Sequence, residues 1–249
     1  MILINFLNRL KIKSNIYIYN FTNMSYTEKQ YFEINSQFQT QNSKEEEYFL
    51  DVIKKTIKIY FELGSSSRSS KKVNCIHEGI VDILLTLFLK EKGYTVKMEQ
   101  NIQSHNFSEK KKCDIVILKN NTPFIVFPVK FSMCGYKKNR NNYLENLTGE
   151  LYLMKAKNPN LNIIPINIIM DKVPTLDGSK KIKNFEHIYT DNFIPYNILV
   201  KNKLCYDMIN YIVEVEHSKK ENELFDNIQS IKQFKTQYRS FKSILKDLL

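Results

Sequence analysis

An acidic residue and a lysine stand at the ends of two apolar segments that predict neighbouring strands. Asp114 opens the first segment, in "CDIVIL", and Lys130 closes the second, in "PFIVFPVKF". The linker "KNNT" contains an Asn-Asn pair, which tolerates the left-handed backbone of a tight hairpin turn. Two antiparallel strands of similar length would bring the carboxylate and the amine to the same end of a sheet. A carboxylate there can hold a divalent cation, and a lysine beside it can orient or deprotonate an attacking water.

The segments around this hairpin predict the elements that position the pair. From residue 75 to 170 the patterns run helix, strand, strand, strand, helix, strand. The first helix comes from "CIHEGIVDILLTLFLKEKG", which is apolar on nearly all sides and closes with Gly93. After Asn139, apolar residues at helical spacing mark the second helix: Leu144, Leu147, Leu151 and Met154. "LNIIPINIIM" predicts a further buried strand.

This order, with the acid and the lysine at one end of a hairpin, resembles the PD-(D/E)XK nuclease superfamily, the type II restriction endonuclease-like fold. The resemblance covers about residues 75–170. It implies an α/β protein with an αβββαβ mixed sheet flanked by helices. It also implies Mg²⁺-dependent hydrolysis of phosphodiester bonds in double-stranded DNA, with Mn²⁺ able to substitute, in the manner of a site-specific restriction enzyme.

The chain departs from the usual motif of that superfamily at two positions. Pro128, in "PVK", stands where the superfamily usually has a carboxylate two residues before the lysine, and Cys113 stands where a proline is common. A proline in a strand has no amide donor, so we expect it at an edge or in a bulge. In one branch of the type II enzymes, the helix after the lysine strand supplies the carboxylate.

The segment "VKFSMCGYKKNRNNYLENLTGEL" resembles that branch, which implies a metal site made of Asp114 and Glu145. Glu150 is the second choice, since it lies nearer the apolar face of the helix but further from the lysine. Lys130 would position the water, and Glu78, at the start of the first core helix, would be an accessory acid. His77 beside Glu78 does not form an HExxH zinc motif, and we interpret it as structural.

The charge balance indicates a polyanionic partner. The net charge is +11 and the isoelectric point is near 9.3, although codon bias in an AT-rich genome could supply part of that charge. Asn and Arg can bind bases in a bidentate manner, and basic side chains bind phosphates. The candidate DNA contacts are Ser132, Tyr136, Lys137, Lys138, Asn139, Arg140, Asn141 and Asn142, with Arg68, Lys71 and Lys72 in an earlier basic loop.

We expect one nuclease domain over the 249 residues. Its predicted parts are an N-terminal arm (1–42), a helix with a basic loop (43–73), the catalytic core (75–170) and a mainly helical C-terminal extension (171–249). Apolar residues from Leu224 to Leu248 follow a stripe near 3.5-residue spacing. That stripe predicts a helix that packs on the core of its own chain or joins two copies, and we expect a homodimer.

The four cysteines have no paired short spacing, which favours a reducing compartment. No apolar run reaches the roughly 18 residues that a membrane span needs. The sequence therefore predicts an intracellular protein without membrane contact, cytoplasmic, or nuclear in a eukaryote. Two other functions stay open: a catalytically inactive nuclease fold that binds DNA, and a repair or mobile-element nuclease that reads DNA structure.

Overall fold

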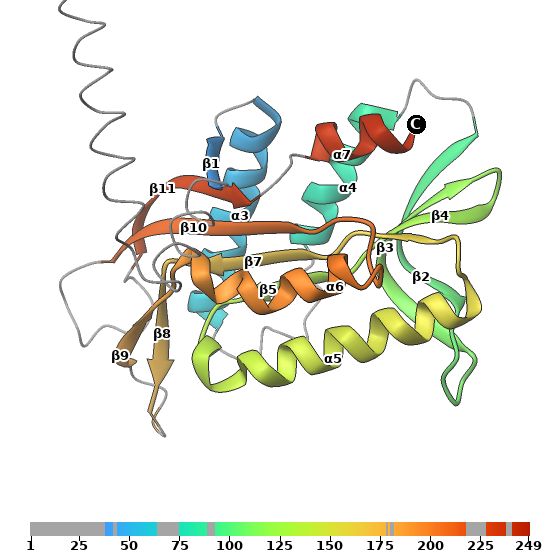
Figure 1. Ribbon diagram of the computed structural model, residues 1–249. Helices are drawn as coiled ribbons and strands as arrows, with labels where there is room; N and C mark the ends of the chain where they lie inside the picture. Colours follow the sequence, from blue (N-terminus) through green and yellow to red (C-terminus); the bar gives the residue numbers. More distant parts are fainter. Residues whose placement is uncertain are drawn as a thin grey trace, which may run out of the picture.

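Helices lie on both sides of a mixed set of strands in the computed structural model of this chain (Figure 1). The structure describes residues 38–41, 44–63, 75–88, 93–177, 179, 182–217, 228–237 and 241–249. The predicted α/β class is confirmed. The order helix, three strands, helix, strand predicted for the middle of the chain is also observed, with two of the strands interrupted.

Two helices near the N-terminus pack closely against each other: α3 (Lys44–Leu63) and α4 (Cys75–Phe88). Their inward residues are fully or almost fully buried: Phe49, Ile53, Ile57, Ile76, Ile80, Ile83 and Leu84. Gly79 of α4 sits against Val52 of α3, where an added Cβ would lie 2.7 Å from Val52 Cγ1. The absence of a side chain on Gly79 therefore sets how closely the two helices approach.

Three antiparallel strands follow: β2 (Tyr94–Gln103), β3 (Lys110–Lys119) and β4 (Thr122–Phe127). The predicted Asn-Asn turn joins β3 to β4, with φ of 50° at Asn120 and 65° at Asn121. Two successive left-handed residues match the twist of the flanking strands, as hairpins require. The turn prediction is therefore confirmed.

Two prolines interrupt two neighbouring parallel strands at the same level. Pro128 separates β4 from β5 (Val129–Ser132), and Pro165 separates β6 (Asn162–Ile163) from β7 (Ile166–Met170). The register is the same before and after the gap, since Ile125 pairs with Asn162 and Val129 with Ile166. Pro128 therefore lies opposite Pro165. Neither proline has an N–H to donate, so each strand lacks one backbone donor there, while Ile164 N and Ile166 N still donate to the carbonyls of Val126 and Pro128, both at 2.8 Å.

The interruption at the two prolines divides the strands into a sheet of order β2-β3-β4-β6 and a sheet of order β1-β11-β10-β7-β5. The second sheet includes β1 (Phe38–Gln41), β10 (Ile209–His217) and β11 (Ile228–Gln237). We expected Pro128 at an edge or in a bulge. It lies instead at an interruption of a central strand, with β3 on one side and β6 and β7 on the other.

Helix α5 (Tyr136–Lys157) connects β5 to β6 and lies on the side of the strands away from α3, α4 and α7 (Phe241–Leu248) (Figure 1). Aromatic side chains join the α3 and α7 side to the sheet, because the Phe49 ring contacts both Tyr211 and Phe241. On the other side, Leu151 and Met154 of α5 are fully buried. The strands therefore have a packed layer on each face.

The prediction of a mainly helical C-terminal extension is wrong. After β7 the chain forms one hairpin, a short 3-10 helix and a short α-helix, and then β10, β11 and α7. The bounds of the first four are β8 (Lys172–Leu176), β9 (Ile182–His187), η3 (Thr190–Tyr196) and α6 (Asn197–Lys201). The N-terminal arm also needs correction, because residues 38–41 form β1, which pairs with β11.

The apolar stripe that predicted one long C-terminal helix belongs partly to strand β11. Ile228, Ile231 and Phe234 have the three-residue spacing typical of a helix, yet their Cα partners are alternate residues of β10: His217, Val215 and Val213. Register irregularities in the pairing account for the difference, because a bulge places two residues of one strand opposite one of the other. The predicted dimer helix from Leu224 to Leu248 is therefore not formed.

Candidate active site

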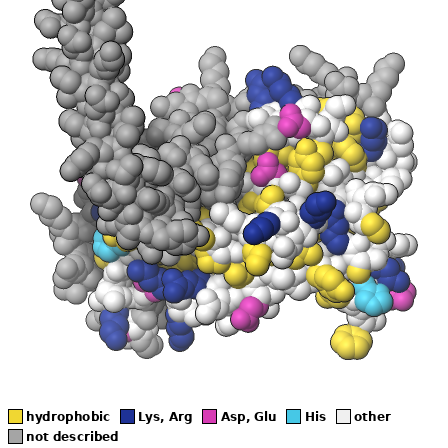
Figure 2. Space-filling model, viewed as in Figure 1, with side chains coloured by type: hydrophobic (Ala, Val, Ile, Leu, Met, Phe, Trp, Pro, Cys, Tyr) yellow, Lys and Arg dark blue, Asp and Glu magenta, His cyan; other side chains and the backbone are white. Residues whose placement is uncertain are grey.

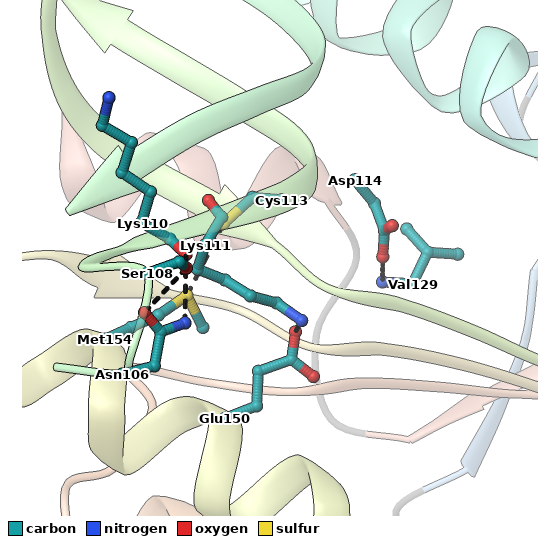
Figure 3. Close-up of polar contacts among 9 residues, drawn as sticks. All are labelled: Asn106, Ser108, Lys110, Lys111, Cys113, Asp114, Val129, Glu150 and Met154. Carbon is teal, nitrogen blue, oxygen red and sulfur yellow. Dashed lines mark hydrogen bonds and ion pairs between the residues drawn. The ribbon is translucent and has the colours of Figure 1, made fainter. Parts of the chain in front are cut away.

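Asp114 lies where strand β3 passes the interruption at Pro128. The last β3–β4 pair before the gap joins Ile115 to Phe127, so the N–H of Val129 has moved out of that ladder. Asp114 Oδ2 accepts a hydrogen bond from Val129 N at 2.7 Å (Figure 3). The carboxylate thus satisfies a backbone donor that the proline would otherwise leave without its strand partner. This contact gives Asp114 a structural role in addition to any chemical one.

A pocket of about 240 Å³ opens beside this interruption and beneath α5. Four of its lining residues carry charge: Lys111, Asp114, Lys130 and Glu150. The others are Pro128, Val129, Tyr143, Asn146, Leu147, Asn167 and Tyr196. The structure therefore brings Asp114 and Lys130 to one pocket, as the hairpin predicted, and adds an acid and a second lysine to them.

Lys130 extends from β5 towards α5 and is exposed at the pocket. Its Nζ lies 4.7 Å from the centre of the Tyr143 ring. An ammonium over an aromatic face is attracted by the negative face of the ring, which limits the positions that the lysine samples. The Tyr143 ring, on the helix that follows β5, is therefore one partner of the Lys130 ammonium.

Glu150, the second choice from the sequence, is the helix acid that lines the pocket with Asp114 and Lys130. The α5 residues in this pocket are Tyr143, Asn146, Leu147 and Glu150, which follow the i, i+3, i+4, i+7 spacing of a single helical face. Glu145 is five positions before Glu150, so the two side chains point roughly 140° apart around the helix. Glu145 is exposed and lines a separate depression.

Glu150 Oε1 is paired with Lys111 Nζ at 2.5 Å, and both side chains are about one third exposed. Lys111 comes from β3, three residues before Asp114, and extends towards α5 (Figure 3). The sequence reasoning missed this lysine. Strand alternation could not have found it, because Lys111 and Asp114 are three residues apart and alternation alone places them on opposite faces.

The remaining predicted acid, Glu78, does not line the pocket. It is exposed on α4, within electrostatic range of the Tyr48 hydroxyl of α3. The aspartate one turn further along α4, Asp82, accepts a hydrogen bond from that hydroxyl at 2.8 Å. Glu78 therefore belongs to the α3–α4 surface, and the geometry gives it no contact with the Asp114 pocket.

The predicted DNA-binding loop is largely the start of a helix, because α5 begins at Tyr136. Ser132 and Tyr136 are 4% and 1% exposed, which leaves them without a surface to offer DNA. Asn139 is half-buried and its side chain donates to the carbonyl of Gly135 at 2.9 Å. The members that remain exposed are Lys137, Lys138, Arg140, Asn141 and Asn142. Arg68, Lys71 and Lys72 lie outside the described residues.

Two groups near the site have pKa values that burial raises. The Tyr196 phenol lines the pocket, and desolvation holds its pKa above the usual value, so it stays protonated at neutral pH. Burial also raises the pKa of the Cys113 thiol to about 12. Cys113 Sγ lies 3.6 Å from Met154 Sδ beneath α5. Tyr196 can therefore offer a hydrogen-bond donor, whereas Cys113 is a packing residue.

The pocket offers two carboxylates to a cation and no larger group of protein ligands. Among the described residues, no three His, Cys, Asp or Glu side chains gather closely enough to hold a metal together. Asp114 and Glu150 supply two carboxylates to one polar pocket. Mg²⁺ is commonly bound through one or two carboxylates, with water and substrate phosphates completing its shell. Asp114 and Glu150 are therefore the side chains of this pocket that would hold such an ion.

The described surface carries its Lys and Arg side chains in several small groups over the face shown in Figure 2. Within the part of the chain that the structure describes, no helix is both long and apolar enough to cross a membrane. The chain matches no protein-family model, and it matches none of the curated proteins either.

Proposed function

We propose that this protein is a Mg²⁺-dependent DNA endonuclease that resembles the type II restriction enzymes. The observation that carries the proposal is the convergence of Asp114, Lys130 and Glu150 on one pocket, from two strands and the helix that follows them. A restriction endonuclease-like core requires the same order of elements that residues 75–170 adopt. The position of the pocket at the interrupted strand fits a motif in which Pro128 replaces the usual carboxylate.

Each pocket residue has a role that its position supports. Asp114 and Glu150 hold the cation, and Glu150 rather than Glu145 supplies the displaced carboxylate. The bound ion would polarise the scissile phosphate and stabilise the leaving oxygen. Lys130, held over the Tyr143 ring, orients the attacking water and offsets charge that develops on the phosphate. Tyr196 stays protonated and, at 4% exposed, forms part of the pocket wall.

Double-stranded DNA is the substrate class that the charge favours. The chain carries a net charge of +11, and the first turns of α5 expose Lys137, Lys138 and Arg140 close in sequence to the pocket residue Tyr143. Basic side chains beside a site of phosphate chemistry would position the DNA backbone, and exposed Asn141 and Asn142 can bind base edges. Cleavage of both strands is most simply achieved by a homodimer, whose contact surface is not the predicted C-terminal helix.

A catalytically inactive DNA-binding protein is the alternative that a specific observation favours. Both pocket acids already have partners within the chain, Val129 N for Asp114 and Lys111 for Glu150. Acids that serve only such contacts would leave a nuclease fold that binds DNA without cutting it. A repair or mobile-element nuclease would share the pocket and differ in the DNA that it selects.

Digestion of a supercoiled plasmid separates these functions. We expect cleavage with Mg²⁺ or Mn²⁺, none with EDTA, and discrete linear fragments if recognition is sequence-specific. Glu150→Gln should lower the cleavage rate by orders of magnitude. The matched control is Glu99→Gln, which neutralises a carboxylate that pairs with Lys112 and lines neither depression, and it should cut normally. DNA binding without cleavage by the wild type would establish the inactive fold, and cutting restricted to branched or nicked DNA would establish the repair class.

A further inference from the structure

The ion pair between Lys111 and Glu150 stands between two depressions. Both residues line the pocket that contains Asp114, and both also line a second, more open depression of about 420 Å³. The other residues that line the second depression are Ser104, Asn106, Glu145, Asn146, Gly149 and Leu153. Lys111 can therefore reach either depression by a change of its own side-chain conformation.

The backbone that carries Lys111 is held in place by its own loop. Asn106 Nδ2 and Ser108 Oγ both donate to the carbonyl of Lys110, at 3.0 and 2.8 Å, and Ser108 Oγ also contacts Asn106 Oδ1 (Figure 3). The start of β3 is thus fixed, whereas the ammonium at the end of four methylenes is free to exchange partners. An ion pair with both members about one third exposed is weak enough to exchange readily.

An ammonium on Glu150 competes with any other cation for the same carboxylate. With Lys111 in place, the two acids of the pocket are balanced by two lysines. Removal of Lys111 from Glu150 leaves a pocket with an excess of negative charge beside Asp114, which favours a divalent ion. The released ammonium then needs a new anion, and the adjacent open depression is large enough to admit a phosphate group.

We propose that Lys111 is the resident counter-ion of Glu150 and that it exchanges this carboxylate for a DNA phosphate when the divalent metal binds. This inference rests on the proposed nuclease function. It assigns the second depression as the subsite for a phosphate next to the one that reacts. It also makes metal and DNA bind cooperatively, because each ligand favours the position of Lys111 that admits the other.

The test compares Lys111→Met with Lys112→Met, two variants that lose the same charge from adjacent residues of β3. Lys112 pairs with Glu99 away from the pocket, at 2.5 Å and with both side chains about half exposed. Mn²⁺ binding is measured by electron paramagnetic resonance on the full chain. Without DNA, Lys111→Met should bind Mn²⁺ about tenfold more tightly than the wild type, and Lys112→Met should match the wild type.

The second measurement repeats the titration with a phosphorothioate duplex bound. The duplex should tighten Mn²⁺ binding to the wild type and to Lys112→Met several-fold, and should have little effect on Lys111→Met. Lys111→Gln, which keeps a polar side chain of similar reach, repeats both titrations in case the methionine variant does not fold, as judged by circular dichroism.

Unchanged or weaker Mn²⁺ binding by both Lys111 variants would overturn the exchange while leaving the nuclease proposal intact. Equally tighter Mn²⁺ binding by Lys112→Met would also overturn the exchange, because the loss of any nearby positive charge would then explain the effect. If the wild type itself binds no Mn²⁺, with or without the duplex, both the exchange and the proposed metal-dependent function fail.

Discussion

The contact between Asp114 and Val129 allows the structural and chemical roles of this acid to be separated. Asp114→Ala removes the acceptor of the Val129 N–H, whereas Asp114→Asn keeps an oxygen of the same reach and loses the charge. We therefore expect Asp114→Ala to lower both stability and cleavage. We expect Asp114→Asn to keep most of the stability and lose cleavage, since a neutral amide holds a divalent cation poorly.

The size of the effect follows from the 2.7 Å hydrogen bond to a half-buried carboxylate. Loss of a partner for a buried donor costs about 1–3 kcal/mol of unfolding free energy. Because water in the adjacent pocket can replace part of that bond, we expect Asp114→Ala to lose about 1–2 kcal/mol. For a chain of this size, 1 kcal/mol shifts the melting temperature by about 2–4 °C. Asp114→Ala should thus melt about 2–8 °C below the wild type. Asp114→Asn should fall by about half as much or less.

The assay is thermal unfolding followed by circular dichroism without metal or DNA, so that stability is measured independently of the proposed function. Cleavage of plasmid DNA at saturating Mg²⁺ is measured on the same preparations. Pro128→Ala is a useful companion, because it leaves every ligand in place and should change cleavage little.

Two results would refute the reasoning. An Asp114→Ala variant that melts with the wild type would mean that the Val129 N–H does not depend on this carboxylate. Near wild-type cleavage by Asp114→Asn would remove Asp114 from the metal site, whatever its effect on stability.

The other predictions concern packing, DNA, assembly and thiols. Gly149→Ala should raise the melting temperature, since an added Cβ meets nothing within 4 Å and alanine favours a helix by about 1 kcal/mol over glycine. Gly79→Ala should lower the melting temperature, because its Cβ would lie 2.7 Å from Val52 of α3. Equal shifts of the melting temperature in the two variants would contradict this. DNA affinity measured by fluorescence anisotropy should fall steeply with added salt, because neutralised phosphates release counterions, and a flat salt titration would exclude DNA as the partner. Light scattering should report a dimer with DNA, and a monomer under all conditions would exclude the homodimer. Burial raises the pKa values of Cys113 and Cys205 to about 12, so at pH 8 both remain thiols and should resist Ellman's reagent until the chain is unfolded. Rapid labelling of Cys113 or Cys205 in the native protein, located by mass spectrometry, would contradict this, whereas labelling of the partly exposed Cys134 would not.

The sequence by itself determined the helices, the β3–β4 hairpin and the placement of Asp114 and Lys130 at one end of the sheet. Helical spacing located α3, α4 and the body of α5, and the Asn-Asn pair located the β3–β4 hairpin with its two left-handed residues. Because a hairpin fixes the register of its own strands, Asp114 and Lys130 could be expected at the same end of the sheet. These features depend on interactions between residues that are near in sequence, where spacing carries the information.

Only the tertiary structure decided which residues complete the pocket. The start of α5 at Tyr136 sets the rotation of the helix over the strands. That rotation places Glu150 in the pocket that Asp114 also lines and leaves Glu145 on another face of the helix. The position of Pro128 opposite Pro165 depends on the pairing of two strands separated by a whole helix. Likewise, β11 could be told from a helix only through its bulged pairing with β10. In each case the outcome is set by contacts between distant segments, and the local spacing of residues is compatible with more than one such arrangement.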